Sequence, residues 1–173
     1  KKVASYLNSK YAVGCINGTS ALQVALRILE VGKGDEVIVP TLTFVATINS
    51  VIYNNAKPIF MDCDDFYNID AEKTIKFIKN ETVFRNNFTF NKKTRKRIPV
   101  ILPVHLWGNA AKLEELVKVC KKRNISIVED AAESFGSKYI NGNLKNRFTG
   151  TIGKVGCLSF NGNKMITTGG GGM

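Results

Sequence analysis

The sequence predicts an α/β fold in which βα units surround a mostly parallel central sheet. Apolar runs of strand length alternate with segments of helical period along the 173 residues, and this alternation is typical of parallel sheets covered by helices. Glycine and proline residues separate these segments. A hydrophobic content of 44% is sufficient for one full-sized core. No internal repeat is present, so we expect a single domain.

The predicted elements follow one another in a regular order. A helix with Val3, Tyr6 and Leu7 on one face opens the chain. The polar and basic stretch Asn80–Ile98 has no clear period, and we interpret it as an excursion or hairpin. The predicted strands are Tyr11–Ile16, Glu36–Val39, Pro58–Met61, Val100–Val104, Ile125–Glu129 and Cys157–Phe160. The further predicted helices are Ser20–Leu29, Val45–Tyr53, Ala71–Ile78 and Ala111–Arg123.

The positive charge of the chain is concentrated in one region. The formal net charge is +11 and the isoelectric point is near 9.6. A basic insert beside a solvated helix face accounts for this excess, and no aromatic residue within Asn91–Arg97 could stack on bases. We therefore predict no nucleic-acid partner. The basic residues of this region are Lys92, Lys93, Arg95, Lys96, Arg97, Lys112, Lys118, Lys121, Lys122 and Arg123, opposed by Glu114 and Glu115.

Cysteine spacing and the apolar pattern bear on the compartment. The four cysteines are widely spaced and only His105 accompanies them, which favours neither a metal site nor a disulfide framework. No apolar run of membrane-spanning length and no leader-like amino end is present, so we expect a reduced, cytoplasmic protein without a membrane span. The chain opens without Met inside a predicted helix and stops one residue after a glycine run, which is typical of a fragment.

Asn17-Gly18-Thr19-Ser20 is the first candidate for chemistry. It lies between a predicted strand and a predicted helix, where free backbone N–H groups and the helix dipole can hold a phosphate. Gly18 permits close approach of such a group. The alternative is that Asn17 or Thr19 only caps an ordinary helix, and for this segment alone we favour that interpretation.

Two further candidates lie later in the chain. Glu129-Asp130-Ala131-Ala132-Glu133 places acidic residues at the carboxyl end of a predicted buried strand, where ligands gather in open α/β sheets. A carboxylate there can bind a protonated ring nitrogen, a metal or a ribose, or it can cap a helix. Lys164 lies near Ser159 and the run Gly169–Gly172, but the spacings of nucleotide-binding glycine loops are absent. Taken alone, Lys164 would be interpreted as an exposed surface residue.

The three candidates are more informative together than separately. Pyridoxal phosphate (PLP) needs a lysine that forms a Schiff base with its aldehyde, a carboxylate that keeps its pyridine nitrogen protonated, and donors for its phosphate. Lys164, Asp130 and the Gly18 turn supply one candidate for each requirement. No metal site is predicted.

With these residues in view, the sequence resembles the DegT/DnrJ/EryC1/StrS family of sugar aminotransferases. The resemblance implies that residues 1–173 are part of the large domain of a PLP-dependent transferase of fold type I, an aspartate aminotransferase-like three-layer sandwich, here truncated and without its small carboxyl-terminal domain. NKKT (91–94) and the glycine-rich ending are closest to the LegC-like branch, which implies UDP-linked 4-keto-6-deoxy sugars. The matching stretches are NGTSALQVAL (17–26), GDEVIVPTLTFVAT (34–47), NID (68–70), PVHLWGN (103–109), VEDAAESFGSKY (128–139) and SFNGNKMITTGGGGM (159–173).

The resemblance also implies roles for individual residues. Lys164 would form the Schiff base and carry the proton between the amino acid and the sugar, while Asp130 would pair with the pyridinium. Glu133 would approach the ring hydroxyl, and Phe44 would stack on the ring. His105 would line the same crevice as a catalytic residue, although a structural histidine bonded to a loop is equally compatible with the sequence. The phosphate would be held by Gly18, Thr19, Ser20 and Ser159.

The implied activity is amino-group transfer from L-glutamate to a nucleotide-linked keto sugar, in a homodimer. Two residues depart from the family pattern: Lys154 stands where relatives often have Asp, and Gly170 where many have Glu. Two alternatives stay open, a catalytically silent relative that acts as a binding or assembly partner and an α/β module that only binds phosphate. A sugar dehydratase of the same fold carries His in place of the lysine, and Lys164 disfavours it.

Overall fold

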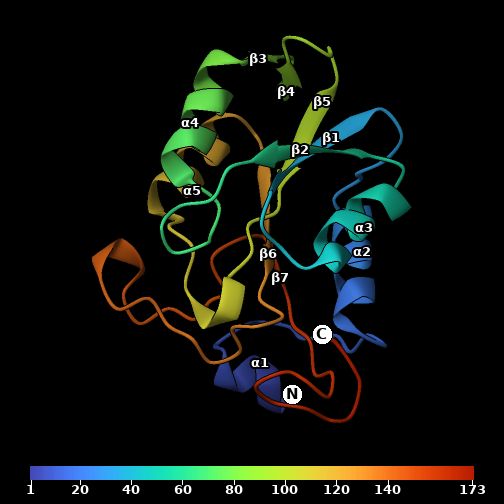
Figure 1. Ribbon diagram of the computed structural model, residues 1–173, viewed down its shortest axis with the longest axis vertical. Coiled ribbons are helices and arrows are strands. Elements are labelled where there is room, and N and C mark those ends of the chain that lie inside the picture. Colours follow the sequence, from blue (N-terminus) through green and yellow to red (C-terminus); the bar gives the residue numbers. More distant parts are fainter.

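A seven-stranded sheet forms the middle layer of the computed structural model, which describes residues 1–173 (Figure 1). Strands β2, β1, β5, β6 and β7 lie side by side in that order and are parallel, whereas β4 and β3 form an antiparallel extension on β5. The prediction of an α/β fold with a mostly parallel sheet is confirmed. The strands are β1 Asp35–Pro40, β2 Lys57–Met61, β3 Thr82–Arg85, β4 Phe88–Asn91, β5 Arg97–Ile101, β6 Ser126–Asp130 and β7 Val155–Cys157.

Helices cover both faces of the sheet and make the molecule three-layered (Figure 1). On β1, Val37 and Val39 pack with α2 and α3, whereas Ile38 packs in the cluster that includes α4 and α5. All three side chains are fully buried, and each contributes about 2 kcal/mol of hydrophobic free energy. None of the helices combines the length and apolar character needed to cross a membrane. The helices are α1 Lys2–Tyr6, α2 Gly18–Ile28, α3 Val45–Tyr53, α4 Ala71–Asn80 and α5 Glu114–Lys122, with short 3-10 turns at Leu106–Gly108 and Gly142–Leu144.

The stretch Asn80–Ile98 contains the predicted hairpin. Strands β3 and β4 are joined by a two-residue Asn-Asn turn at positions 86–87, where both residues have a positive φ that asparagine tolerates. Asn91 Nδ2 and Thr94 Oγ1 donate hydrogen bonds to Glu36 Oε2, at 2.8 and 3.0 Å. Because Glu36 is buried near the start of β1, these bonds anchor the hairpin to the amino end of the sheet.

The last predicted strand, Cys157–Phe160, is displaced in the structure. Strand β7 begins at Val155 and ends at Cys157. The residues after it leave β6 and pair with the glycine-rich segment, since Leu158 N–H donates to Met173 O at 2.8 Å. The end of β7 is therefore set by the glycine-rich segment before Met173, which lies beside it only in the folded chain.

The prediction of a strand at Tyr11–Ile16 is wrong. Within this segment only Cys15 forms a bridge, to Gly172. Tyr11 and Val13 are 72% and 73% exposed. They lie beside a cavity of about 930 Å³ that also borders β7.

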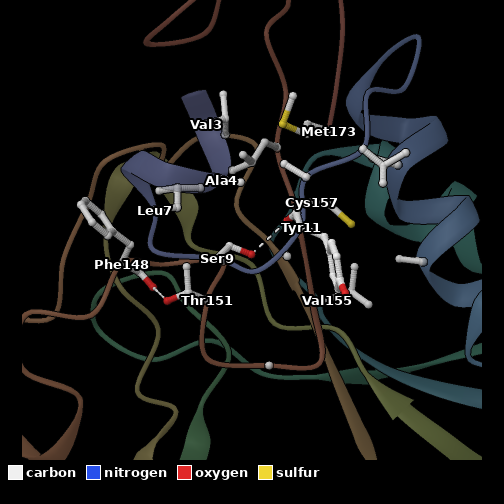
Figure 2. A pocket seen from close by; sticks show the side chains of 18 of the residues that line it. Val3, Ala4, Leu7, Ser9, Tyr11, Phe148, Thr151, Val155, Cys157 and Met173 are labelled. Atoms are coloured by element: carbon white, nitrogen blue, oxygen red, sulfur yellow. Dashed lines mark hydrogen bonds between the residues drawn. The ribbon is translucent and has the colours of Figure 1, made fainter. Parts of the chain in front are cut away.

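The cavity lies between α1, one side of α2 and the edge strand β7. Figure 2 shows Val3 of α1 and Leu7, which directly follows α1, on one side of it, and Tyr11, Val155 and Cys157 around it. Its lining is mostly apolar. None of the predicted site residues lines this cavity, so the candidate site lies elsewhere.

Candidate active site

The carboxyl ends of β5 and β6, together with the loop after β7, gather the polar side chains of interest. Ligands bind at this edge in open parallel sheets. Asp130 is the last residue of β6, and Lys164 lies in the loop that follows β7. Thr168 N–H and the Thr167 hydroxyl both donate to the Phe160 carbonyl, at 3.1 Å each, and so close the loop around Lys164.

Asp130 is a buried carboxylate whose contacting donors are neutral. Its Oδ2 accepts a hydrogen bond from the Thr47 hydroxyl (2.7 Å), and its Oδ1 accepts one from the Ala132 N–H (3.1 Å). Burial raises the pKa of Asp130 above its ordinary value, and these bonds and the charge of nearby Lys164 offset burial only in part. A cationic ligand atom would stabilise the ionised form of this carboxylate.

Lys164 is sheltered from solvent and has two partners. Its Nζ lies 3.2 Å from Glu133 Oε1, and its side chain is 13% exposed. The ammonium also lies 5.7 Å from the centre of the Phe44 ring, at the amino end of α3. The structure thus brings Lys164, Glu133 and Phe44 together, and the Lys164 charge acts on Asp130. The interpretation of Lys164 as an ordinary exposed lysine is not supported.

The Gly18 turn packs directly against Ser159. A Cβ built on Gly18 would lie 2.9 Å from the Ser159 Cβ, so a larger residue at position 18 would collide. Asn17 caps α2, because its Oδ1 accepts a hydrogen bond from the Ser20 N–H (2.8 Å). Asn17 is thus a helix cap, as one interpretation of the sequence predicts, and the cap engages the Ser20 N–H while leaving the Ser20 hydroxyl available. Thr19 is half-buried beside them, and its contact with phosphate stays a prediction.

His105 is enclosed in the protein and does not face the crevice. It is fully buried, its Nε2 lies 2.8 Å from Glu129 Oε2, and its Nδ1 accepts a hydrogen bond from the Ala111 N–H (3.0 Å). The predicted helix Ala111–Arg123 is shorter in the structure, since α5 begins at Glu114 and the Ala111 N–H is bonded to His105. The structure does not support the expectation that His105 lines the crevice, since both ring nitrogens are engaged. Its backbone N–H donates to the Asp130 carbonyl (3.0 Å), which makes it a positioning residue.

Thr47 and Trp107 belong to the site, although the sequence assigned neither of them a role, even within the family-like stretches that contain them. Thr47 is fully buried and bonds to Asp130, and its Oγ1 lies 2.7 Å from Thr43 Oγ1. The i, i+4 spacing of these two hydroxyls is a pattern that could have indicated the pair. The Trp107 N–H donates to Glu133 Oε2 (3.1 Å), a backbone contact that leaves no mark in the sequence.

The family model of the DegT/DnrJ/EryC1/StrS aminotransferase family matches residues 1–173. The chain belongs to this family. Among curated relatives, GDP-perosamine synthase of Escherichia coli O157:H7 is 41% identical over 99% of this DegT-family chain and 42% of that protein. The predicted family resemblance is thereby confirmed.

Solved structures of the DegT family agree with the observed fold. A DegT DnrJ EryC1 StrS aminotransferase from Brucella abortus has a TM-score of 0.86 and 34% identity, covering 99% of this chain and 42% of that one. The PLP form of Spr1654 from Streptococcus pneumoniae has a TM-score of 0.80 and 28% identity, again over 99% of this chain and 42% of that one. The prediction of a PLP fold-type I architecture is confirmed, and the chain spans about two fifths of the length of these relatives.

Proposed function

We propose that this chain is part of the large domain of a PLP-dependent aminotransferase that acts on a nucleotide-linked keto sugar. One observation carries the proposal: a sheltered lysine, Lys164, is held by Glu133, three residues after a buried carboxylate, Asp130, that has only neutral donors in contact. Membership of the DegT family and the likeness to a PLP-form structure support the same assignment.

The residues of the site fit the groups of PLP. A protonated ring nitrogen would give Asp130 the cationic partner that its contacts do not supply. Phe44 is 63% exposed at the amino end of α3 and offers a ring face for stacking. Gly18 lies so close to Ser159 that no side chain fills the turn at the amino end of α2, where a phosphate is favoured. When bound, PLP supplies an electron sink for the carbon that gains or loses the amino group.

The protein's own groups would hold the ring and move the proton. Lys164 would bind the cofactor aldehyde through Nζ and shuttle a proton between the amino-acid and sugar carbons. Asp130 would keep the ring nitrogen protonated, and the 2.7 Å bond from Thr47 would orient its carboxylate. Glu133 would bind the ring hydroxyl edge. The phosphate would be held by Thr19, Ser20 and Ser159.

The substrates follow from the family resemblance and from the relatives. We propose L-glutamate as the amino donor and a 4-keto-6-deoxy sugar as the acceptor. The LegC-like features favour a UDP-linked sugar, whereas relatives at 41% and 38% identity are named GDP-perosamine synthases. A screen of keto sugars on both nucleotides decides between them. A homodimer and a cytoplasmic location complete the proposal as predictions.

Reductive trapping on the full-length protein tests the function. Borohydride should fix the cofactor on Lys164, which peptide mass spectrometry detects, and should abolish amine transfer. Lys164→Ala should lose trapping and slow transfer by roughly 10³-fold or more. Lys154→Ala is the matched control, because Lys154 is an exposed lysine at the amino end of β7, away from the Lys164 loop that follows this strand, and nothing in the structure explains its departure from the family pattern.

The outcomes separate the alternatives for the whole protein. Cofactor fixed on another lysine would overturn the assignment of Lys164. A protein that neither traps the cofactor nor transfers an amine would favour the silent relative that acts as a binding partner. Phosphate binding without trapping would favour the simple phosphate-binding module.

A further inference from the structure

The turn after β5 holds Trp107 in a conformation that tryptophan rarely adopts. Trp107 has φ 52° and ψ 29°, in the left-handed region, and lies in the 3-10 turn Leu106–Gly108. A residue with a Cβ is disfavoured there by about 1 kcal/mol or more. Such strain persists only where the surroundings impose it, so the contacts of this turn identify what it positions.

Four hydrogen bonds hold the turn and the residue before it in place. Leu106 N–H donates to Asn68 Oδ1 (3.1 Å), and Trp107 N–H donates to Glu133 Oε2 (3.1 Å). The ring of His105, just before the turn, is bonded at both nitrogens. Because the other oxygen of Glu133 lies 3.2 Å from Lys164 Nζ, a single carboxylate separates the Trp107 backbone from the candidate catalytic amine.

The indole of Trp107 is exposed instead of packing in the core. It is 66% exposed, and its ring lies edge-on to the Tyr67 ring with centroids 5.4 Å apart. Tyr67 is 50% exposed and also has a positive φ, of 66°. Of the non-glycine residues with positive φ, Tyr67 and Trp107 are the only aromatic ones, and they contact each other. Two strained backbone positions therefore present one exposed aromatic pair, and the backbone of one of its members is linked to Lys164 through Glu133.

We propose that Trp107, supported by Tyr67, is a specificity residue that packs against the sugar ring of the nucleotide-sugar substrate. This inference rests on the proposed function. The apolar C–H face of a deoxy sugar suits an aromatic platform, whose large ring gives contact area with little conformational freedom to lose. We assign Trp107 to the sugar and not to the nucleotide base. Trp107 is linked to Lys164 through the single carboxylate of Glu133, and the reacting carbon belongs to the sugar. The base is separated from that carbon by the diphosphate.

Equilibrium binding to the full-length protein tests the platform without turnover. In a Lys164→Ala background, GDP-perosamine is compared with GDP, and UDP-N-acetylglucosamine with UDP, by titration calorimetry. Trp107→Gly should weaken binding of the nucleotide sugar about 3- to 10-fold and leave the free nucleotide unchanged. Trp107→Phe should restore most of the affinity. In the active protein, Trp107→Gly should raise KM for the sugar and leave kcat within about twofold.

The choice of glycine separates binding from folding. Glycine adopts a positive φ without strain, so Trp107→Gly should not lower the thermal stability of the protein. Phe84→Ala is the matched control, because Phe84 is a partly exposed aromatic residue on the distant β3 strand and should leave sugar binding unchanged.

The inference would be overturned if Trp107→Gly bound the nucleotide sugar as tightly as the parent protein. It would also be overturned if Trp107→Gly lost equal affinity for the nucleotide sugar and for the free nucleotide, or if the wild-type protein bound neither nucleotide sugar. Failure of the proposed function can be distinguished from failure of this inference. In the first case borohydride does not trap the cofactor on Lys164, whichever residue stands at position 107.

Discussion

Asp130 is a buried residue whose ionised carboxylate destabilises the folded protein when no ligand is bound. Its carboxyl group is buried against the Thr47 hydroxyl and the Ala132 N–H, both neutral. Burial therefore raises its pKa, and ionisation weakens the folded state. The free energy lost by burying this charge is recovered when a cationic group binds to it, which is the arrangement expected of a ligand site and not of a structural ion pair.

Asp130→Asn should stabilise the cofactor-free protein and impair cofactor-dependent transfer. Because the folded pKa lies above the ordinary 3.8, stability from the protonated carboxyl is complete below that value and is lost as pH rises through the folded pKa. The amide is neutral at every pH, and it can accept from Ala132 and donate to Thr47. Thermal unfolding at neutral pH should show a gain of about 1 kcal/mol, and transfer should fall by about 10²- to 10³-fold. A clear loss of stability at neutral pH would contradict this account.

The residues of the site were predictable only where the chain itself brings them together. Asp130 and Glu133 stand in one short segment at the end of a predicted strand, and the sequence indicated both. Their observed partners are remote: Thr47 is 83 positions from Asp130, Trp107 is 26 from Glu133, and Lys164 is 31 from Glu133. Periodicity carries no information on such pairs, so only the combined chemical demands of PLP and the family resemblance suggested that Lys164 and Asp130 meet.

Among the secondary-structure elements, β6 is joined to its neighbours by the buried Glu129 carboxylate. Its Oε1 accepts hydrogen bonds from the Ile152 and Gly153 N–H groups, at 2.6 Å each. Its Oε2 accepts one from the Gly150 N–H (2.9 Å) and lies 2.8 Å from His105 Nε2. Burial opposes ionisation, but the bond and charge of His105 and the backbone donors outweigh it and lower the pKa of Glu129. This carboxylate anchors both the turn after β5 and the segment before β7.

Glu129→Gln should therefore loosen three elements at once. Because its folded pKa lies below the ordinary 4.5, the stabilisation by Glu129 is present above that value and is lost as pH falls through the folded pKa. The amide places an N–H₂ group against backbone N–H donors and leaves them unpaired, at about 1–3 kcal/mol each. Urea unfolding at neutral pH should show a loss of about 3 kcal/mol, with a weaker dependence on acid.

The matched control for this element-level test is Glu115→Gln, because Glu115 is exposed on α5 and pairs only with Lys118. It should change stability by less than about 1 kcal/mol. Equal stability of Glu129→Gln and the wild type across the acid range would show that the carboxylate does not hold these elements.

The central elements were predictable because their pattern is set by burial on both faces. Every residue of β1 is buried, and its apolar run predicts a strand in the middle of a sheet. The segments at the edge of the sheet have similar apolar runs, but their pairing depends on the distant stretch Gly171–Met173. An apolar run does not identify its neighbour, which is why Tyr11–Ile16 was assigned wrongly and the strand at Cys157–Phe160 was displaced.

Across the whole molecule, the basic hairpin and the candidate site lie at opposite ends of the sheet (Figure 1). Strand β4 pairs with the start of β5, at Phe90 and Arg97, whereas Asp130 ends the neighbouring strand β6. A strand of this length spans roughly 16 Å, about twice the screening length in physiological salt. The positive charges of Lys92–Arg97 therefore give little direct attraction for an anionic substrate at the site.

Neutralising Lys92, Lys93 and Lys96 to Gln should thus leave KM for the nucleotide sugar within about twofold at physiological ionic strength. At about 0.01 M salt the screening length grows to roughly 30 Å and exceeds the length of the sheet, so KM of the wild type should fall below that of the triple variant. Steady-state kinetics at the two salt concentrations measure both effects. A several-fold rise of KM in physiological salt would mean that the hairpin contacts the nucleotide directly. The diphosphate would then lie at the amino end of the sheet, too far from Lys164 for the sugar to reach it, and the assignment of the site at the carboxyl end would be wrong.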